Sequence, residues 1–211
     1  YETGVYTKNI YAERNPGVVK ELGDVGNDLQ IYGSRLYAVI NCSNFVEVMD
    51  VNTAKHIGVF SIPNCRYIAF KGKYAYVSSY AGPVVESDPN YRLGYIAKVD
   101  TATLEIIGTC DVGYRYPNYD CTVSVVDLET FTEIKKIETG VINLHRMELD
   151  VYGQIWVSSR GDYYGTSSKT LVIDSRTDKV TDVLDLLPNS EMTRCGDSLY
   201  VYSNEWSYVT N

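Results

Sequence analysis

The side chains of this 211-residue chain best suited to bind a ligand are tyrosines, arginines and asparagines at the ends of short apolar stretches. A surface rich in rings and hydrogen-bond donors suits a large, partly polar molecule or a protein partner. Ordinary packing of the same side chains within loops is the alternative. The predicted ligand-binding residues are Asn41, Arg66, Tyr80, Tyr91, Tyr116, Tyr119, His145, Arg146, Arg160, Tyr163, Tyr164, Asn204 and Trp206.

Asparagine begins several apolar stretches that we expect to be inner strands: Asn27, Asn64, Asn143 and Asn189. Two residues after each lie Leu29, Arg66, His145 and Glu191. If these strands line a central channel, this second set surrounds its mouth. Alternatively, each asparagine caps a bend by hydrogen bonding to the backbone. We prefer capping for the asparagines and leave both interpretations open for Arg66, His145 and Arg146.

Catalysis has little support in the sequence. The two histidines, His56 and His145, are not spaced as a metal-binding pair, and no G-x-S-x-G motif occurs. We therefore predict a protein that is not an enzyme, with no catalytic residue, no cofactor and no metal site. The enzyme alternative is a metal-dependent, lactonase-like hydrolase in which Glu191, Asp28 and the asparagines supply oxygen ligands to a divalent ion.

The composition limits the classes of partner. A net charge of −8 and a pI near 4.8 repel phosphate backbones, so a nucleic-acid partner is not expected. No run of about 18 apolar residues is present, which argues against a membrane-spanning helix. The 20 tyrosines are mostly expected as strand residues in the core, since tyrosine favours half-buried strands.

The five cysteines are scattered, and their odd number argues against a disulfide framework. A single bridge between Cys42 and Cys65 remains open, because each follows an asparagine near a strand end.

An internal repeat predicts the architecture. Asp followed three residues later by Thr separates two apolar stretches, and this pattern forms a tight turn in which Asp bonds the backbone ahead of it. The copies are VEVMDVNT (46–53), IAKVDTAT (96–103), VSVVDLET (123–130) and LVIDSRT (171–177). Residues 1–4 read as the end of another such turn, so residues 5–10 are expected to form its returning strand.

The repeat is irregular in one place. Counted from Thr3, the marking threonines are separated by 50, 50, 27 and 47 residues. The interval of 27 is too short for four strands. We expect that about one strand pair is missing near residues 113–115, that both termini fall inside a unit, and that the intact protein has seven units.

A complete unit reads as four strands, at 66–72, 74–79, 94–100 and 103–112. Nearly continuous apolar strands indicate sheets covered on both faces, as in a β-propeller; a solenoid is the alternative. We predict an all-β fold, a partial β-propeller of four-stranded antiparallel blades, with residues 1–211 as one domain. Loop length varies only between the second and third strands of a unit, at 41–44, 81–93 and 161–169, so we place the binding face there.

These segments also resemble a known group. YAYVSS, IWVSS and LYVYSN, followed by V-x-V-(V/I)-D-x-x-T, are similar to the repeat of YncE-like, YVTN-type β-propellers, which include surface-layer and exported bacterial proteins. INCSN, PNCRYIAFKGKYAYVSSY and RGDYYGTSSKT resemble surface lipoprotein propellers of Gram-negative bacteria that capture corrinoids for a TonB-dependent transporter.

The resemblance implies a non-catalytic, exported protein at the cell surface or in the periplasm of a Gram-negative bacterium. Its ligand would be a small molecule, a corrinoid for transporter-linked uptake, bound on the long-loop face. Membrane association is expected only through a lipid anchor that this chain does not carry. The alternative is a protein-interaction propeller that docks a membrane transporter or a matrix partner.

Overall fold

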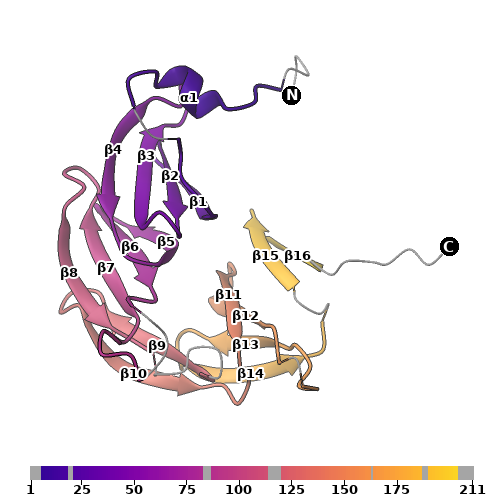
Figure 1. Cartoon of the computed structure of the whole chain (residues 1–211). Helices are drawn as coiled ribbons and strands as arrows, with labels where there is room; N and C mark the ends of the chain where they lie inside the picture. Colours follow the sequence, from indigo (N-terminus) through magenta and orange to yellow (C-terminus); the bar gives the residue numbers. More distant parts are fainter. Residues whose placement is uncertain are drawn as a thin grey trace. The chain divides into compact units, whose positions relative to one another are not determined.

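The computed structural model describes residues 6–18, 21–82, 87–113, 120–162, 164–186 and 190–203 (Figure 1). The chain divides into two compact units. The first contains residues 1–112 and 130–132, and the second contains residues 113–129 and 133–211. Each unit is built from antiparallel sheets in which strands follow one another in chain order.

Within the described ranges, five sheets correspond to the repeats of the sequence, and we call them blades one to five. Blade one contains β1 (Gly26–Tyr32), β2 (Arg35–Ile40), β3 (Phe45–Asp50) and β4 (His56–Ser61). Blade two contains β5 (Cys65–Lys71), β6 (Tyr74–Ser79), β7 (Tyr95–Asp100) and β8 (Ile106–Asp111). Blade three contains β9 (Thr122–Asp127) and β10 (Thr132–Glu138). Blade four contains β11 (Leu144–Leu149), β12 (Gln154–Ser159), β13 (Thr170–Asp174) and β14 (Lys179–Leu184), and blade five contains β15 (Ser190–Cys195) and β16 (Ser198–Ser203).

The all-β architecture of four-stranded antiparallel blades is therefore confirmed. Blade three has only two strands among the described residues, which agrees with the short interval of the repeat. The predicted break near 113–115 falls mostly on residues 114–119, which lie outside the described part of the chain.

The Asp-x-x-Thr turn forms as predicted between the third and fourth strands. In blade one, Oδ1 of Asp50 accepts hydrogen bonds from the backbone N–H of Asn52 (3.1 Å) and of Thr53 (2.8 Å), and from the Thr53 hydroxyl (2.8 Å). Asp100 accepts the equivalent backbone bonds in blade two. These bonds keep the pKa of both carboxyl groups below the usual value.

The residue after each marking threonine has a left-handed backbone: Ala54 (φ 56°), Leu104 (φ 61°), Phe131 (φ 55°) and Asp178 (φ 53°). Glycine would adopt this conformation without strain, yet none of the four is glycine. Their side chains account for the choice, because three of them contact the outer strand of the preceding blade.

We call these three contacts the turn–strand pairs. A Cβ placed on Gly58 of β4 would lie 2.6 Å from Cδ1 of Leu104, and one on Gly108 of β8 would lie 3.3 Å from Cδ1 of Phe131. Both glycines therefore leave room for the apolar side chain of the next blade. At the corresponding place in β10, Lys135 forms an ion pair with Asp178, with Nζ 2.5 Å from Oδ2.

The core lies between neighbouring blades. Along β2, Tyr37 and Val39 face blade two, in a buried cluster that includes Val77 and Val99. In the second unit, Val157, Leu171 and Ile173 of blade four form a cluster with residues of blade three. Because side chains alternate between the two faces of a sheet, a blade with apolar contacts on both faces has strands that read as nearly continuous apolar runs.

Exposure on the inner strands follows from the incomplete blade. Ile68 of β5 is 5% exposed because blade one covers it, whereas Met147, at the equivalent register in β11, is 55% exposed. Among the described residues, blade three supplies only β9 and β10 against blade four.

One element was not predicted. Residues 5–10 were expected to form a strand, but residues 6–9 are irregular and a short helix, α1 (Ile10–Arg14), follows (Figure 1). The ring of Tyr11 packs in a cluster with Ala38, Ile40 and Met49 on the second face of blade one. Helix α1 thus covers the face of this blade that lies opposite to blade two.

Candidate functional site

The candidate site lies at the blade edge where the first strand begins and the second strand ends. In blade two, the N–H of Tyr80 donates to the carbonyl of Asn64 (3.3 Å), and in blade four the N–H of Arg160 donates to that of Asn143 (3.0 Å). Tyr80 and Arg160 therefore occupy equivalent positions at the same edge of their own blades, as predicted.

Two of the asparagines cap this edge. Asn64 (φ 45°) and Asn143 (φ 57°) have left-handed backbones, and asparagine tolerates this conformation better than most residues. Their side-chain amides donate to the carbonyls of Ala81 (3.2 Å) and Gly161 (3.0 Å). The capping interpretation is therefore confirmed for both.

The assignment of Asn27 to the same position is wrong by two residues. Val25 (φ 60°) takes this place in blade one, where its carbonyl accepts the N–H of Asn41 at 2.9 Å. The side chain of Asn27 instead donates to the carbonyl of Arg66 (3.0 Å), and that of Asn41 donates to the carbonyl of Cys65 (3.0 Å). Both amides thus link blade one to blade two. The fourth asparagine, at position 189, lies outside the described residues.

A cation and a ring form the edge pair of blade two. The guanidinium carbon of Arg66 lies 4.8 Å from the centre of the Tyr80 ring, a favourable cation–π arrangement. Nε of Arg66 is buried without a hydrogen-bond partner in the described part of the chain. Tyr80 is 39% exposed, so solvent reaches this pair.

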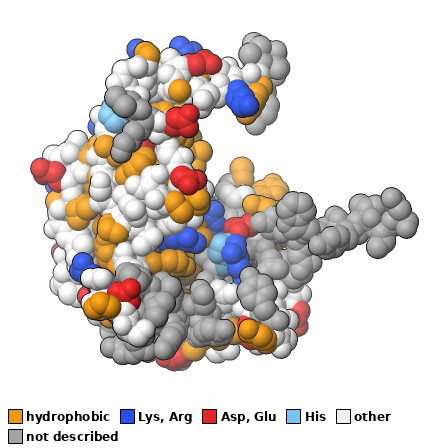
Figure 2. Space-filling view, in the orientation of Figure 1, with side chains coloured by type: hydrophobic (Ala, Val, Ile, Leu, Met, Phe, Trp, Pro, Cys, Tyr) orange, Lys and Arg blue, Asp and Glu red, His pale blue; other side chains and the backbone are white. Residues whose placement is uncertain are grey.

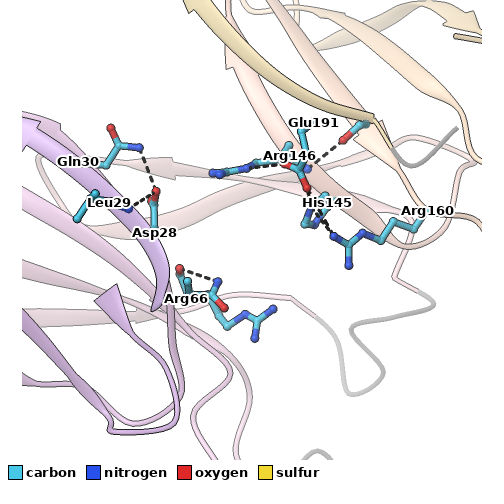
Figure 3. A network of polar contacts seen from close by, with 10 residues as sticks. Asp28, Leu29, Gln30, Arg66, His145, Arg146, Arg160 and Glu191 are labelled. Atoms are coloured by element: carbon cyan, nitrogen blue, oxygen red, sulfur yellow. Dashed lines mark hydrogen bonds and ion pairs between the residues drawn. The ribbon is translucent and has the colours of Figure 1, made fainter. Parts of the chain in front are cut away.

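Blades four and five hold a denser cluster around Glu191 of β15, which we call the Glu191 cluster (Figure 3). One carboxylate oxygen, Oε1, lies 2.6 Å from Nε2 of His145, and the other, Oε2, accepts a hydrogen bond from Nε of Arg146 at 3.0 Å. Nη2 of Arg160 lies 2.8 Å from the same His145 nitrogen and 3.6 Å from Oε1. Figure 3 shows the side chains of His145, Arg146 and Arg160 around Glu191.

The members of the Glu191 cluster differ in exposure. The side chains of His145 and Glu191 are 13% and 14% exposed, whereas that of Arg160 is 48% exposed. The outer part of Arg160 is therefore in reach of a ligand. In a space-filling view, basic, acidic and histidine side chains lie next to one another at the surface (Figure 2).

Burial and charge set the protonation of this cluster. Burial lowers the pKa of His145, and the guanidinium groups of Arg160 and Arg146 lower it further, against the raising effect of Glu191. Burial alone would raise the pKa of Glu191, but the contacts with His145 and Arg146 outweigh it and keep that pKa below the usual value. The cluster therefore holds a carboxylate, two guanidinium groups and a largely neutral imidazole at neutral pH.

The loop that follows Arg160 is held by one carboxylate. Asp162 accepts hydrogen bonds from the N–H of Tyr164 (2.8 Å), the N–H of Thr166 (2.9 Å) and the hydroxyl of Thr166 (2.8 Å). A Cβ on Gly161 would lie 2.0 Å from the carbonyl oxygen of Thr166, so only glycine fits there. Asp162 and Gly161 thus fix the base of this loop, while Tyr164 is 89% exposed.

The remaining predicted residues are less informative. Tyr91, in the loop of blade two, donates its N–H to the carbonyl of Asp88 (2.9 Å). Five predicted residues lie outside the described part of the chain: Tyr116, Tyr119, Tyr163, Asn204 and Trp206.

The sequence placed Glu191 among the side chains expected around the channel mouth and, in the hydrolase alternative, among the metal ligands. In the structure it is the counter-charge of His145 and Arg146. The available signal for its contact with His145 was that both residues follow an asparagine by two positions. Among the described residues, no group of three His, Cys, Asp or Glu side chains is arranged to hold a metal ion.

The cysteines are separate. Cys42 is exposed, Cys65 is buried with its Sγ 3.5 Å from the carbonyl oxygen of Ile40, and neither forms a disulfide. Burial raises the pKa of the Cys65 thiol to about 11. Within the described ranges, no helix has the length and apolar character needed to span a membrane.

Comparisons with known proteins identify the fold. No protein-family profile and no curated protein matches the chain. Hydrazine synthase from Kuenenia stuttgartiensis matches in structure with a TM-score of 0.64 and 16% identity, over 80% of this chain and 51% of that chain. A functionally unknown protein from Desulfotomaculum acetoxidans matches with a TM-score of 0.62 and 11% identity, over 87% and 64% of the two chains. The dihydro-heme d1 dehydrogenase NirN matches with a TM-score of 0.50 and 10% identity, over 76% and 38%.

These structures are β-propeller-type folds, and the chain has a β-propeller-type fold. It spans about half the length of the hydrazine synthase chain. At such low identity the likeness concerns the fold alone.

Proposed function

We propose that this propeller domain binds a ligand, without catalysing a reaction, at the blade edge that carries the Glu191 cluster and the variable loops. The observation that carries the proposal is the half-exposed Arg160, which is held at that edge beside His145 and Glu191. Binding residues are commonly found on loops that a rigid frame positions, and the loop 161–169 begins directly after Arg160.

The ligand is a small molecule with both apolar and polar surface, by resemblance a corrinoid. The rings of Tyr80 and Tyr164 are exposed at this edge in their own units and offer apolar contact, while guanidinium groups offer hydrogen bonds. By the same resemblance, the protein is exported and acts at the cell surface or in the periplasm, in uptake through a transporter. Two matched structures are named as enzymes, but their likeness concerns the fold and adds no catalytic residue here.

Calorimetric titration with cobalamin and cobinamide tests the proposal. We expect saturable binding at micromolar ligand, weakened at least about tenfold in Arg160→Gln, since a charge-assisted hydrogen bond contributes about 1.5–3 kcal/mol. Arg176→Gln is the matched control, because Arg176 lies in the β13–β14 turn of the same blade and contacts only Asp174 among the described residues. Absence of heat with both compounds at micromolar concentrations would reject corrinoid capture.

A further inference from the structure

The His145 ring nitrogen in the Glu191 cluster has two close neighbours that make opposite demands. Oε1 of Glu191, 2.6 Å from Nε2, can only accept a hydrogen bond when the carboxyl group is ionised. Nη2 of Arg160, 2.8 Å from Nε2, can only donate one. Nε2 of a single imidazole either carries a hydrogen or presents a lone pair.

Each form of the imidazole therefore satisfies one neighbour and leaves the other in a poor contact. With a hydrogen on Nε2, His145 donates to Glu191, and the N–H group of Arg160 points at another donor. With a lone pair on Nε2, His145 accepts from Arg160, and the lone pairs of the nitrogen and the Glu191 oxygen face each other. The next contact of Arg160 with the carboxylate, at 3.6 Å, is too long for a good hydrogen bond.

We propose that Arg160 binds an oxyanion of the ligand, a phosphate or a carboxylate, and that His145 then donates its Nε2 hydrogen to Glu191. This inference rests on the proposed function and names the chemistry of the group that the edge recognises. The oxyanion replaces His145 as the acceptor for the N–H groups of Arg160, so that all three side chains have a suitable partner.

Charge favours an anion over a cation at this place. Arg146 and Arg160 carry two positive charges against the single negative charge of Glu191, in a chain whose net charge is −8. Oε2 of Glu191 is bound to Nε of Arg146 at 3.0 Å, and Oε1 lies 3.6 Å from Nη2 of Arg160, so the carboxylate is only a distant partner of Arg160. A planar guanidinium group also matches phosphate and carboxylate oxygens in a bidentate geometry.

Blade two provides the internal contrast. There, the equivalent edge position carries Tyr80, and the guanidinium group of Arg66 lies over its ring. The face of an aromatic ring attracts a cation electrostatically, so this pairing of Arg66 with Tyr80 does not use a hydrogen-bond acceptor. In blade four, Arg160 occupies the position that the Tyr80 ring has in blade two. The hydrogen-bond acceptor for its guanidinium group therefore has to come from elsewhere.

The experiment follows the histidine ring signals by NMR while inorganic phosphate or acetate is added at constant ionic strength, with chloride as the reference salt. The chain has only two histidines. His56, which contacts Glu47 through Nδ1 in the first unit, serves as an internal control. We expect the His145 signals to move to the form with a hydrogen on Nε2, with saturation at millimolar anion, while those of His56 stay in place.

Three variants complete the test. We expect Arg160→Gln to weaken the anion dependence at least about tenfold, Arg160→Lys to keep part of it because a point charge remains, and Arg176→Gln to behave as the wild type. An unchanged response in Arg160→Gln, or parallel movement of both histidines without saturation, would overturn the inference. The relative response to phosphate and acetate identifies the class of oxyanion.

The outcome is distinguishable from that of the proposed function. Saturable phosphate or acetate binding without cobalamin or cobinamide binding would retain the oxyanion site and reject the corrinoid. Corrinoid binding that does not depend on Arg160 would retain the proposed function and reject this site.

Discussion

Replacement of Leu104 by glycine separates two explanations of the left-handed turn residues. If the turn alone matters, glycine stabilises the protein by about 1 kcal/mol, because it removes the strain of a positive φ. If the contact with Gly58 matters, the loss of the side chain outweighs this gain. A fully buried leucine contributes roughly 2–5 kcal/mol relative to alanine, and Leu104 is partly buried, so we expect a loss of about 2 kcal/mol.

The expected free energies of unfolding follow from these two terms. Leu104→Ala keeps the strain and loses the contact, so it destabilises by about 2 kcal/mol. Leu104→Gly loses the contact and relieves the strain, so the net destabilisation is about 1 kcal/mol. Urea denaturation followed by tryptophan fluorescence measures both, with the m-value as a check that the unfolded state is unchanged.

Ala54 provides the matched control, because it has the same backbone conformation in blade one but only a methyl group. Ala54→Gly is expected to be neutral or stabilising by up to about 1 kcal/mol. A Leu104→Gly protein as stable as the wild type, or more stable, would refute the role of the turn–strand pair.

Further predictions concern the candidate site and its loop. Glu191→Gln removes the counter-charge of His145 and Arg146, and we expect a loss of about 1–2 kcal/mol in urea denaturation, below the value for a fully buried pair because solvent reaches the cluster. The pKa of His145 is lower in the folded protein than in the unfolded chain, so the unfolded state binds more protons below pH about 6.5. The contribution of this group to the free energy of unfolding is therefore full above this pH and is lost as the pH falls. His145→Gln should reduce the decrease in the free energy of unfolding between pH 7 and 5. Gly161→Ala forces a Cβ against the carbonyl of Thr166 and is expected to destabilise by roughly 1–3 kcal/mol, with faster hydrogen exchange at residues 164–168. Tyr164→Ala should leave the melting temperature nearly unchanged and weaken cobalamin binding; a large fall in melting temperature would instead assign this ring to the core.

The sequence predicts the strands and turns of this fold well because both depend on local chemistry. β6 has the predicted bounds, Tyr74–Ser79, and the turn at Asp50 makes the predicted hydrogen bonds. The fourth strand begins later than expected, at Ile106 rather than at residue 103, because the left-handed Leu104 extends the turn.

Features that depend on neighbouring blades were harder to predict. Helix α1 forms where a strand was expected, since the ring of Tyr11 packs on blade one and residues 6–9 pair with no described strand. Asn27 was placed two residues out of position because Val25 adopts the left-handed conformation that asparagine has in the other blades.

The candidate site was predicted in part. The equivalent positions of Tyr80 and Arg160, each at the end of the second strand of its own blade, followed from counting strands in an antiparallel sheet. The partnership of His145 with Glu191 joins residues from two blades, and no local pattern encodes a contact across 46 positions.

The turn–strand pairs give the boundaries between blades two kinds of chemistry. Small-to-large contacts join blade one to two and blade two to three, whereas opposite charges join blade three to four. During folding, similar repeats risk docking on the wrong neighbour. Docking on the wrong blade would press Leu104 against Lys135, two repeats away from its own partner Gly58, or leave the carboxylate of Asp178 over Gly108, one repeat away from Lys135. The mismatch penalises misassembly in which a charged member of these pairs meets an apolar side chain or a glycine.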